Sequence, residues 1–457
     1  MRSNRMRHMM VYIKGCLSTS LIVSVLGFAS ICVAQTPQPV VPIQTWQTAQ
    51  GAQVYFVRAP EIPMLNMAIA FRAGSARDEK AYGLAYLTND VMAQGTEKLS
   101  AEALAQGFEN IGADFSDFVD RDKAGFSLTT LVDKQVLQQA TELFAEVVAH
   151  PGFKPEVVSR QKNILLQAIK QATQSPDEVA DQVFYHTLYG NSPYGHPVIG
   201  LASTVEALTP AALRDFYRQH YTARNATLVM VGDISKSQAK TIADRVTAAL
   251  ATGHLLPTLK VQAKALTMTP RHVAHHSSQT AIRIGQNAVD RHSPDFMALY
   301  VGNAILGGDP LISRLKQAVR DDKGLSYVIY SGFNPLAIDG PFITTLQTRN
   351  DQADQAVNVV RSTLARFIQQ GPTQQELDFA KQSLAGRLPI ALSSNASILS
   401  NVMNVGFYHL PLDYFDTRNA RIQSLSQKDI MMAFQRHLQL KHMATILVGE
   451  KPEHAPS

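Results

Sequence analysis

Two segments of this 457-residue chain repeat each other at a nearly constant distance, and this repeat limits the possible folds more than any other feature. Residues 216–233 (FYRQHYTARNATLVMVGD) match residues 434–450 (FQRHLQLKHMATILVGE) in a helix end that starts with Phe, a polar turn, an Ala-Thr pair, an apolar run and a final acid. Residues 126–131 (FSLTTL) match residues 342–346 (FITTL) at nearly the same offset, and a polar turn and an amphipathic pattern follow each. We therefore predict two homologous halves of about 210 residues each.

The hydrophobic patterns in each half predict both strands and helices. In the N-terminal half we expect strands at 54–57, 67–71, 126–131 and 227–231, and helices at 83–92, 101–111, 136–148, 155–173 and 210–217. In the C-terminal half we expect strands at 281–284, 327–332, 342–348 and 445–448, and helices at 295–306 and 311–319. Residues 253–270 show no sustained period and are interpreted as a linker between half 35–252 and half 271–457. Each half is predicted to be α+β.

Residues 1–34 have the pattern of a secretory signal peptide. Arg2, Arg5, Arg7 and Lys14 precede an apolar run at 21–33, and a small residue, Ala34, stands before the expected cleavage point. The alternative is an uncleaved inner-membrane anchor formed by residues 15–34, because about 20 residues suffice to span a bilayer. A lipoprotein signal is disfavoured, because Ile31 stands before Cys32 where a small residue would be needed.

Removal of this segment changes what the composition implies. It contains four of the 42 basic residues and none of the 37 acidic ones, so the net charge falls from +5 to about +1. A nucleic-acid partner, or a membrane partner after cleavage, is then no longer suggested by charge. Both cysteines, Cys16 and Cys32, are also lost, which leaves no disulfide, no cysteine nucleophile and no thiolate ligand. An exported chain without cysteine is expected in a bacterial periplasm.

Several blocks of the mature chain resemble the pitrilysin or insulinase-type zinc peptidases, which include mitochondrial processing peptidase and its bacterial relatives. The resemblance rests on the duplication and on blocks at 71–96 (FRAGSARDEKAYGLAYLTNDVMAQGT), 189–200 (YGNSPYGHPVIG), 228–233 (LVMVGD) and 305–327 (ILGGDPLISRLKQAVRDDKGLSY). It implies two halves, each with a mostly antiparallel sheet flanked by helices, which form a clamshell around a peptide chamber.

The zinc motif of this family, H-x-x-E-H, is degenerate here. Two histidines four residues apart share one helix face and bind zinc, and the intervening Glu activates a metal-bound water. The flanking residues place Tyr86 and Asp90 at the two histidine positions and Asn89 at the glutamate position. The later family carboxylates fall on Ala168 and Gln161. Because Asn89 does not titrate and only one carboxylate remains, we expect no zinc site and no peptide hydrolysis by this chain alone.

The other histidines give weaker signals. Residues 272–276 (HVAHH) are the only dense histidine cluster; a metal site is one interpretation, and a polar strand entry is favoured because alternation would separate the side chains. His196 is expected to pack or cap. The Gly pair at 307–308 is interpreted as a helix end.

The C-terminal half keeps a pair that the resemblance links to substrate. Family members carry an Arg and a Tyr seven residues apart that face the zinc site, bind the substrate backbone and polarise the scissile carbonyl. Arg320 and Tyr327 have this spacing in RDDKGLSY. Both side chains donate hydrogen bonds, which suits an oxygen on which negative charge develops. The alternative is that Arg320 is a solvated charge and Tyr327 a residue of a strand core.

These observations give one leading hypothesis and two alternatives. The leading one is a non-catalytic, metal-free subunit of a periplasmic heterodimer that closes the chamber and lends Arg320 and Tyr327 to a zinc-bearing paralogue acting on peptides. A stand-alone peptide-binding or scaffolding protein would keep the fold without a partner. A metallopeptidase with unorthodox ligands would use Asp90 and groups that the sequence does not reveal.

Overall fold

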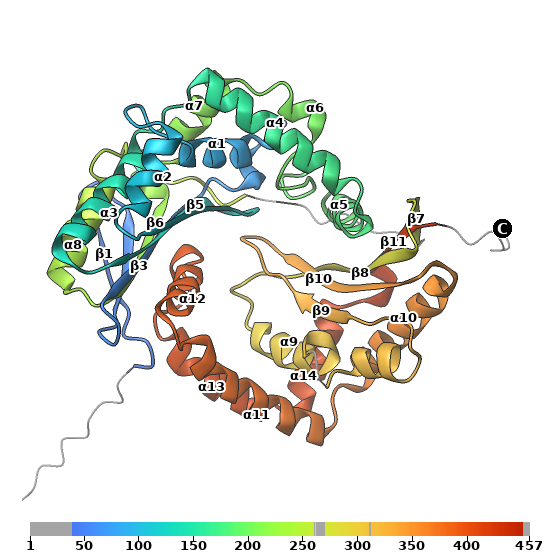
Figure 1. Ribbon diagram of the computed structural model, residues 1–457. Coiled ribbons are helices and arrows are strands. Elements are labelled where there is room, and N and C mark those ends of the chain that lie inside the picture. The colour runs from blue at the N-terminus through green and yellow to red at the C-terminus, as the bar shows by residue number, and fades with distance from the viewer. Residues whose placement is uncertain (1–38, 260, 262–269, 310–311, 451–457) are drawn as a thin grey trace, which may run out of the picture. The chain divides into compact units, whose positions relative to one another are not determined.

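The computed structural model describes residues 39–259, 261, 270–309 and 312–450, so the predicted signal at residues 1–34 lies outside the described residues. It contains two sheets, one in each half, and helices flank both of them (Figure 1). This confirms the α+β fold class with a duplicated, mostly antiparallel architecture.

The N-terminal half contains a six-stranded sheet of order β1-β2-β6-β3-β5-β4. Its strands are β1 (Gln44–Gln47), β2 (Gln53–Arg58), β3 (Met64–Phe71), β4 (Asp114–Val119), β5 (Ala124–Leu131) and β6 (Ala226–Gly232). Its helices are α1 (Leu84–Ala93), α2 (Ala101–Glu109), α3 (Lys134–Ala149), α4 (Pro155–Ala172), α5 (Pro176–Tyr189), α6 (Ala202–Val205), α7 (Pro210–His220) and α8 (Lys236–Thr247).

The C-terminal half contains a five-stranded sheet of order β7-β11-β8-β10-β9. Its strands are β7 (Arg271–Ala274), β8 (Gln279–Val289), β9 (Ile329–Phe333), β10 (Gly340–Arg349) and β11 (Ala444–Gly449). Its helices are α9 (Phe296–Asn303), α10 (Ala353–Gln370), α11 (Gln374–Ala391), α12 (Asn395–Phe407), α13 (Tyr414–Ser424) and α14 (Gln427–His437), with π-helical turns at η3 (Ala304–Gly308) and η4 (Lys316–Asp321).

The two sheets share one topology. In each sheet a single strand pair is parallel, β2 with β6 and β7 with β11, and the other pairs are antiparallel. The strands that carry the repeated Ala-Thr motif, β6 and β11, therefore occupy equivalent central positions, and so do β5 and β10. By the same correspondence the edge strand β4 matches β9, and α1, which follows β3, matches α9, which follows β8.

Each half covers part of the other half's sheet. Helix α5 of the N-terminal half packs on β8 and β11, where Phe184 and Leu188 join a buried cluster with Ala281 and Ile446. Helix α12 of the C-terminal half packs on β2, β3 and β6. Helices of the same half cover the other face of each sheet, so the central strands β3, β6 and β11 are buried on two faces, whereas the edge strands β4 and β7 keep exposed residues.

A buried carboxylate also joins the halves. Asp122, in the turn between β4 and β5, accepts hydrogen bonds from the Tyr194 hydroxyl at 2.6 Å, the Tyr408 hydroxyl at 2.9 Å and the Ala337 N–H at 2.9 Å. Tyr408 and Ala337 belong to the C-terminal half. Each bond to a charged, buried acceptor is stronger than one between neutral groups, so this cluster fixes the two halves to each other.

Two predicted elements of the C-terminal half are wrong in detail. Of the helix expected at 311–319, residues 314–319 are helical, but the helix is π-helical from Lys316 to Asp321 because hydrogen bonds there span five residues rather than four, and residue 311 lies outside the described residues. The strand expected at 327–332 begins only at Ile329, so Tyr327 stands outside it. The Gly pair at 307–308 does end a helix, as predicted.

Candidate functional site

Helix α1 carries the three residues at the family's zinc-motif positions. It begins after Gly83, whose φ of 97° suits glycine and whose missing side chain leaves room for Val205 and the Ile199 carbonyl. Asp78 is buried and accepts the N–H groups of Gly83 and Ala85 at 2.7 Å each, which fixes the start of the helix. Burial raises the pKa of Asp78 to about 7, although these two hydrogen bonds oppose the shift.

Asn89 is fully buried, and its amide is saturated with hydrogen bonds. Its Oδ1 accepts from the Tyr221 hydroxyl at 2.9 Å. Its Nδ2 lies 3.2 Å from Asp117 Oδ2, 3.3 Å from the Gly125 carbonyl and 3.4 Å from the Phe118 carbonyl. An amide held in this way joins α1 to β4, β5 and the end of α7, so its observed role is structural.

Asp90 lies on the same helix near a second carboxylate. Burial and the charge of Asp117 raise the pKa of Asp90 to about 6, and the nearby Arg160 of α4 opposes the shift. Burial also raises the pKa of Asp117, although the hydrogen bond from Asn89 lowers it. The pKa of Tyr86 is raised by burial and by these two carboxylates. This centre therefore combines two weakly acidic carboxyl groups, one phenol and one guanidinium.

The side chains present do not fit a catalytic zinc ion. Such a site needs three ligands of the imidazole, thiolate or carboxylate type, and α1 supplies only Asp90. On α4, Ala168 is exposed and has no donor, and Gln161 is a buried amide. Across residues 39–450, as far as the structure describes them, no three His, Cys, Asp or Glu side chains gather where they could hold a metal.

The remaining histidines have structural surroundings. His196 is buried, stacks on Tyr82 with ring centroids 4.2 Å apart, and bonds through Nδ1 to the Pro197 carbonyl. Residues 272–274 belong to β7, as the strand interpretation predicts. His275 bonds to the Thr173 carbonyl, and His276 pairs with Glu450.

The structure brings Arg320 and Tyr327 together at the surface of the C-terminal half. The Arg320 guanidinium carbon lies 4.8 Å from the centre of the Tyr327 ring, a cation–π contact. The Tyr327 side chain is 80% exposed, so it is not a residue of a strand core. Arg320 also lies 3.9 Å from Asp321, and its side chain is 41% exposed. Among the described residues no hydrogen bond or ion pair links these two side chains to the N-terminal half.

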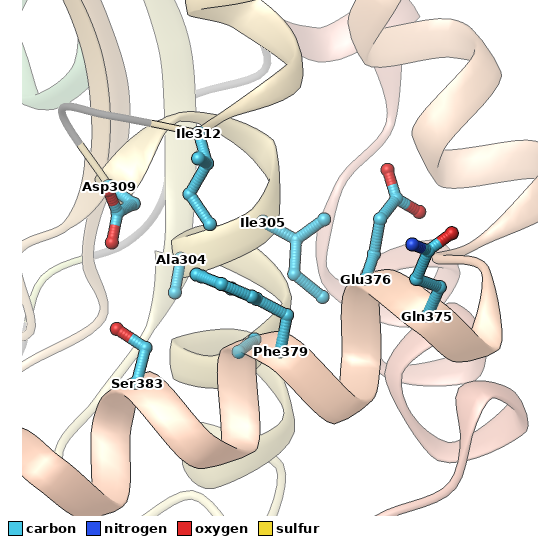
Figure 2. A pocket seen from close by; sticks show the side chains of 9 residues that line it. Ala304, Ile305, Asp309, Ile312, Gln375, Glu376, Phe379 and Ser383 are labelled. Carbon is cyan, nitrogen blue, oxygen red and sulfur yellow. The ribbon is translucent and has the colours of Figure 1, made fainter.

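Two cavities lie away from the α1 centre, one within the C-terminal half and one between the two halves. Figure 2 shows the first, of about 240 Å³, where the Phe379 ring of α11 extends toward Ala304, and Ile305 and Ile312 also line the space. The second, of about 510 Å³, is lined from the N-terminal half by Arg121 and Tyr185 and from the C-terminal half by Tyr330. Tyr330 stands three residues after Tyr327, so this second cavity adjoins the strand that follows the Arg320–Tyr327 pair.

Sequence reasoning missed several residues of the α1 centre. Asp117, Arg160 and Tyr221 lie 27 to 131 residues from Asp90 and carry no motif, so only the fold brings them together. A weak signal existed for Asp117, since it stands in an alternating segment (DFSDFV) that forms the edge strand β4.

Comparison with known proteins agrees with this arrangement. Residues 53–201 match the family model described as insulinase (peptidase family M16), and residues 207–384 match the model described as peptidase M16 inactive domain. A crystal structure described as the peptidase M16 inactive domain from Pseudomonas fluorescens is 38% identical, covers 91% of this chain and 99% of its own, and superimposes with a TM-score of 0.87.

More distant relatives include proteins described as peptidases and one described as a non-peptidase. An uncharacterized zinc protease of Bacillus subtilis is 24% identical over 78% of this chain and 86% of its own length. A protein of Helicobacter pylori described as a non-peptidase homolog is 25% identical over 85% of this chain and 90% of its own length.

Proposed function

The chain belongs to the M16, or insulinase, family of peptidases as a member of its inactive type, and from this premise we propose that it is the metal-free subunit of a heterodimeric zinc peptidase. In this role it closes the peptide chamber and supplies Arg320 and Tyr327 to a zinc-bearing paralogue. Zinc, with the water it activates, would be held by the partner's H-x-x-E-H motif. The chain would meet this partner in the periplasm, to which the segment at residues 1–34 would export it.

The observation that carries the proposal is the contrast between exposure and chemistry at Arg320 and Tyr327. A tyrosine whose ring is 80% exposed gains little from packing, and a guanidinium stacked on it keeps N–H groups free to donate. Both groups are donors of the kind that stabilise a developing oxyanion. Among the described residues no group of side chains could hold a metal and so activate a water, so the reacting carbonyl and its attacking water would have to be brought to this pair by a second protein.

The N-terminal half supports the same role from the opposite side. At the glutamate position of the zinc motif, Asn89 accepts a hydrogen bond from Tyr221 and donates to Asp117, and at the later carboxylate position Ala168 has no polar side-chain atom. A chain with this centre can contribute substrate contacts and chamber walls, but no activated water.

In the part of the chain that the structure describes, no helix is long and apolar enough to cross a membrane.

The test is to mix the purified mature chain with a zinc-motif paralogue from the same genome and to measure cleavage of a peptide library. We expect cleavage only from the mixture, and a loss of cleavage with Arg320→Ala or Tyr327→Phe. Arg366→Ala, at an exposed position of α10, is the matched control and should leave cleavage unchanged. Full activity of the paralogue alone would exclude the proposal.

A second candidate is a stand-alone peptide-binding protein, and the cavity between the halves favours it. Its walls mix apolar side chains with Arg121, Tyr185 and Tyr330, which suits a peptide side chain. This candidate predicts that the isolated chain binds peptides as a monomer, in a fluorescence titration, and that the paralogue neither forms a complex with it nor changes the affinity.

A further inference from the structure

The turn that presents Arg320 is π-helical, and two side-chain pairs span it with matching geometry. Lys316 Nζ lies 2.6 Å from Asp321 Oδ2, and Gln317 Nε2 donates to Asp322 Oδ1 at 2.6 Å. Both pairs join residues five positions apart. In an α-helix, residues five apart point about 140° away from each other around the axis, so neither pair could form there. In a π-helix the hydrogen-bond spacing is itself five residues.

The backbone repeats the same connection. The Asp322 N–H donates to the Gln317 carbonyl at 2.9 Å, so Gln317 and Asp322 are joined by a backbone bond and a side-chain bond at once. The Gly324 N–H then donates to the Arg320 carbonyl, and the Leu325 N–H to the Val319 carbonyl, each at 2.9 Å. These bonds continue the turn directly toward Tyr327.

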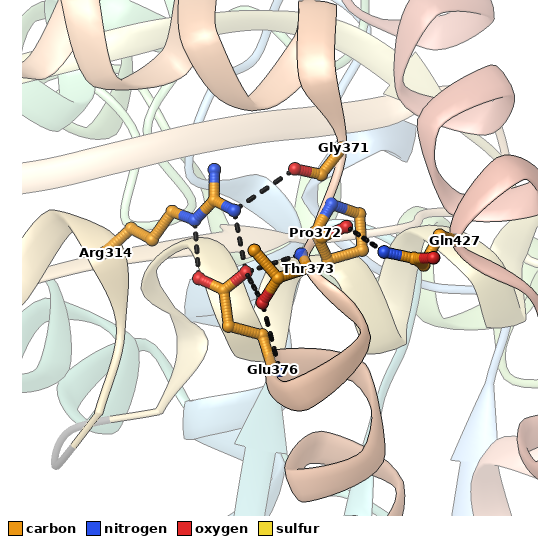
Figure 3. A network of polar contacts seen from close by, with 6 residues as sticks. All are labelled: Arg314, Gly371, Pro372, Thr373, Glu376 and Gln427. Carbon is orange, nitrogen blue, oxygen red and sulfur yellow. Dashed lines mark hydrogen bonds and ion pairs between the residues drawn. The ribbon is translucent and has the colours of Figure 1, made fainter.

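The base of the turn is fixed to the rest of the C-terminal half. Figure 3 shows Arg314 holding Glu376, with both carboxylate contacts at 2.7 Å, and donating to the Gly371 carbonyl at 3.2 Å. Burial alone would raise the pKa of Glu376, but hydrogen bonds from Arg314 and Thr373 outweigh it and lower the pKa to about 2. Leu315 and Val319 are fully buried on the inner side.

π-Helical turns are rare and are often found at functional sites. Since one extra residue per turn rotates everything that follows, relaxation of η4 to an α-helix would swing Arg320 away from Tyr327. Asp321 has a double part, because it holds Lys316 and also lies 3.9 Å from the Arg320 guanidinium.

From these contacts we infer that Lys316, Gln317, Asp321 and Asp322 are positioning residues that lock η4 as a π-helix and so aim Arg320, with Tyr327, at the substrate carbonyl. This inference rests on the proposed function for its purpose, but the lock itself is a property of the isolated chain. Such orientation matters because a misplacement of about 1 Å can cost about 10²-fold in rate.

The first arm of the test needs no partner. Hydrogen exchange of the isolated chain is compared between wild type and the double variant Lys316→Met/Gln317→Ala. We expect the amides of residues 320–327 to exchange about tenfold faster in the variant, with the unfolding midpoint nearly unchanged, because the local opening free energy falls while the core remains. Unchanged exchange at these amides would overturn the inference.

The second arm measures peptide cleavage by the mixture with the paralogue. We expect Lys316→Met/Gln317→Ala to lower kcat about tenfold with little change in KM, because a misdirected Arg320 loses mainly transition-state contacts. Lys316→Arg keeps the ion pair and should retain wild-type kcat. Gln374→Ala breaks a Gln–Asp contact of 2.8 Å on the regular helix α11 and is the matched control, expected to act as wild type.

The two arms separate the two proposals. An inactive mixture of the wild-type proteins with faster exchange in the double variant would remove the subunit role and keep the lock. An active mixture whose kcat is the same for wild type and double variant would remove the positioning role.

Discussion

The centre around Asn89 and the pair Arg320–Tyr327 lie in different halves of one duplicated fold, and they differ in burial: the first is buried and the second is exposed. Asn89 is fully buried, and each atom of its amide has a partner. Tyr327 is largely exposed, with the Arg320 guanidinium stacked on it. The first centre lies in the core of the N-terminal half, where its hydrogen bonds stabilise that half; it is the buried centre. The second lies at the surface, where the Tyr327 ring gains little from packing, and such exposure is what the proposed contact with a second protein requires.

The largest effect on stability should come from restoring the family's glutamate at residue 89 in the buried centre. Asn89→Glu would bury a negative charge beside Asp117 and would leave the Tyr221 hydroxyl without its present geometry. We expect the free energy of unfolding to fall by about 4 kcal/mol, in the range of buried unpaired charges. Urea denaturation measures this change. Asn163→Glu, at an exposed position of α4, should change it by less than about 0.5 kcal/mol. Equal stability of both variants would mean that the centre is more open than its contacts indicate.

The next effect concerns the surface pair and leaves stability aside. Arg320→Ala should lower kcat/KM of the mixture with the paralogue about 10²-fold, equivalent to about 2.7 kcal/mol of transition-state stabilisation. Its free energy of unfolding should stay within about 0.5 kcal/mol of wild type, because the side chain is partly exposed. Steady-state kinetics and urea denaturation on the same samples check both statements. A variant that lost stability and activity together would place Arg320 among the structural residues.

A smaller effect compares two tyrosines of the C-terminal half. Tyr408→Phe removes one of the three donors to the buried Asp122 carboxylate and should cost about 1–2 kcal/mol of unfolding free energy. Tyr327→Phe removes a hydroxyl from an exposed ring and should cost nothing measurable. Thermal and urea unfolding distinguish the two variants. Equal losses would contradict the assignment of Asp122 as the link between the halves.

The smallest effect is a pH dependence of the unfolding free energy, and it tests the ionisation of Asp90 in the buried centre. The pKa of Asp90 is about 6 in the folded protein, above its ordinary value of 3.8, so the folded state holds the proton more tightly than the unfolded state. Its ionisation therefore lowers stability as pH rises through 6, and Asp90→Asn removes this loss. After a discount for its partial exposure, we expect the variant to be more stable by about 1 kcal/mol at pH 8 and equal to wild type near pH 4.

The control for this pH dependence is Asp244→Asn, at an exposed position of α8, whose stability should follow that of wild type at each pH. If the wild-type protein were more stable at pH 8 than at pH 5, and Asp90→Asn had the same stability as wild type at both values, the raised pKa of Asp90 would be contradicted.

Much of the fold could be predicted because its signals are local. The strands around residues 126–131 and 227–231 and the helices α3 and α4 follow from hydrophobic period and from residues such as Pro155 at a helix start. Helix α5 was missed because its apolar residues pack on strands of the other half, whose residues Ala281 and Ile446 lie about 100 and about 260 residues away in the sequence.

The candidate site was predictable only where a motif marks it. The spacing of Arg320 and Tyr327 identified the pair, but not its exposure, because the strand after it begins two residues later than the pattern suggests. No periodicity distinguishes one π-helical turn from an α-helix, so the geometry of η4 could not be inferred. The partners of Asn89 come from β4, β5 and the end of α7, and tertiary contact alone assembles them.

Helix α5 packs on the sheet of the C-terminal half and α12 on the sheet of the N-terminal half, and this has a consequence for folding during synthesis. The sheet of the N-terminal half is completed by β6 at Gly232, yet the helix that covers its second face starts only at Asn395. While the intervening residues are being synthesised, an apolar surface that includes Val229 and Val231 has no cover. A ribosome-bound fragment is therefore open to aggregation until α12 has been made, so the N-terminal half completes its folding only when synthesis of the chain is nearly finished.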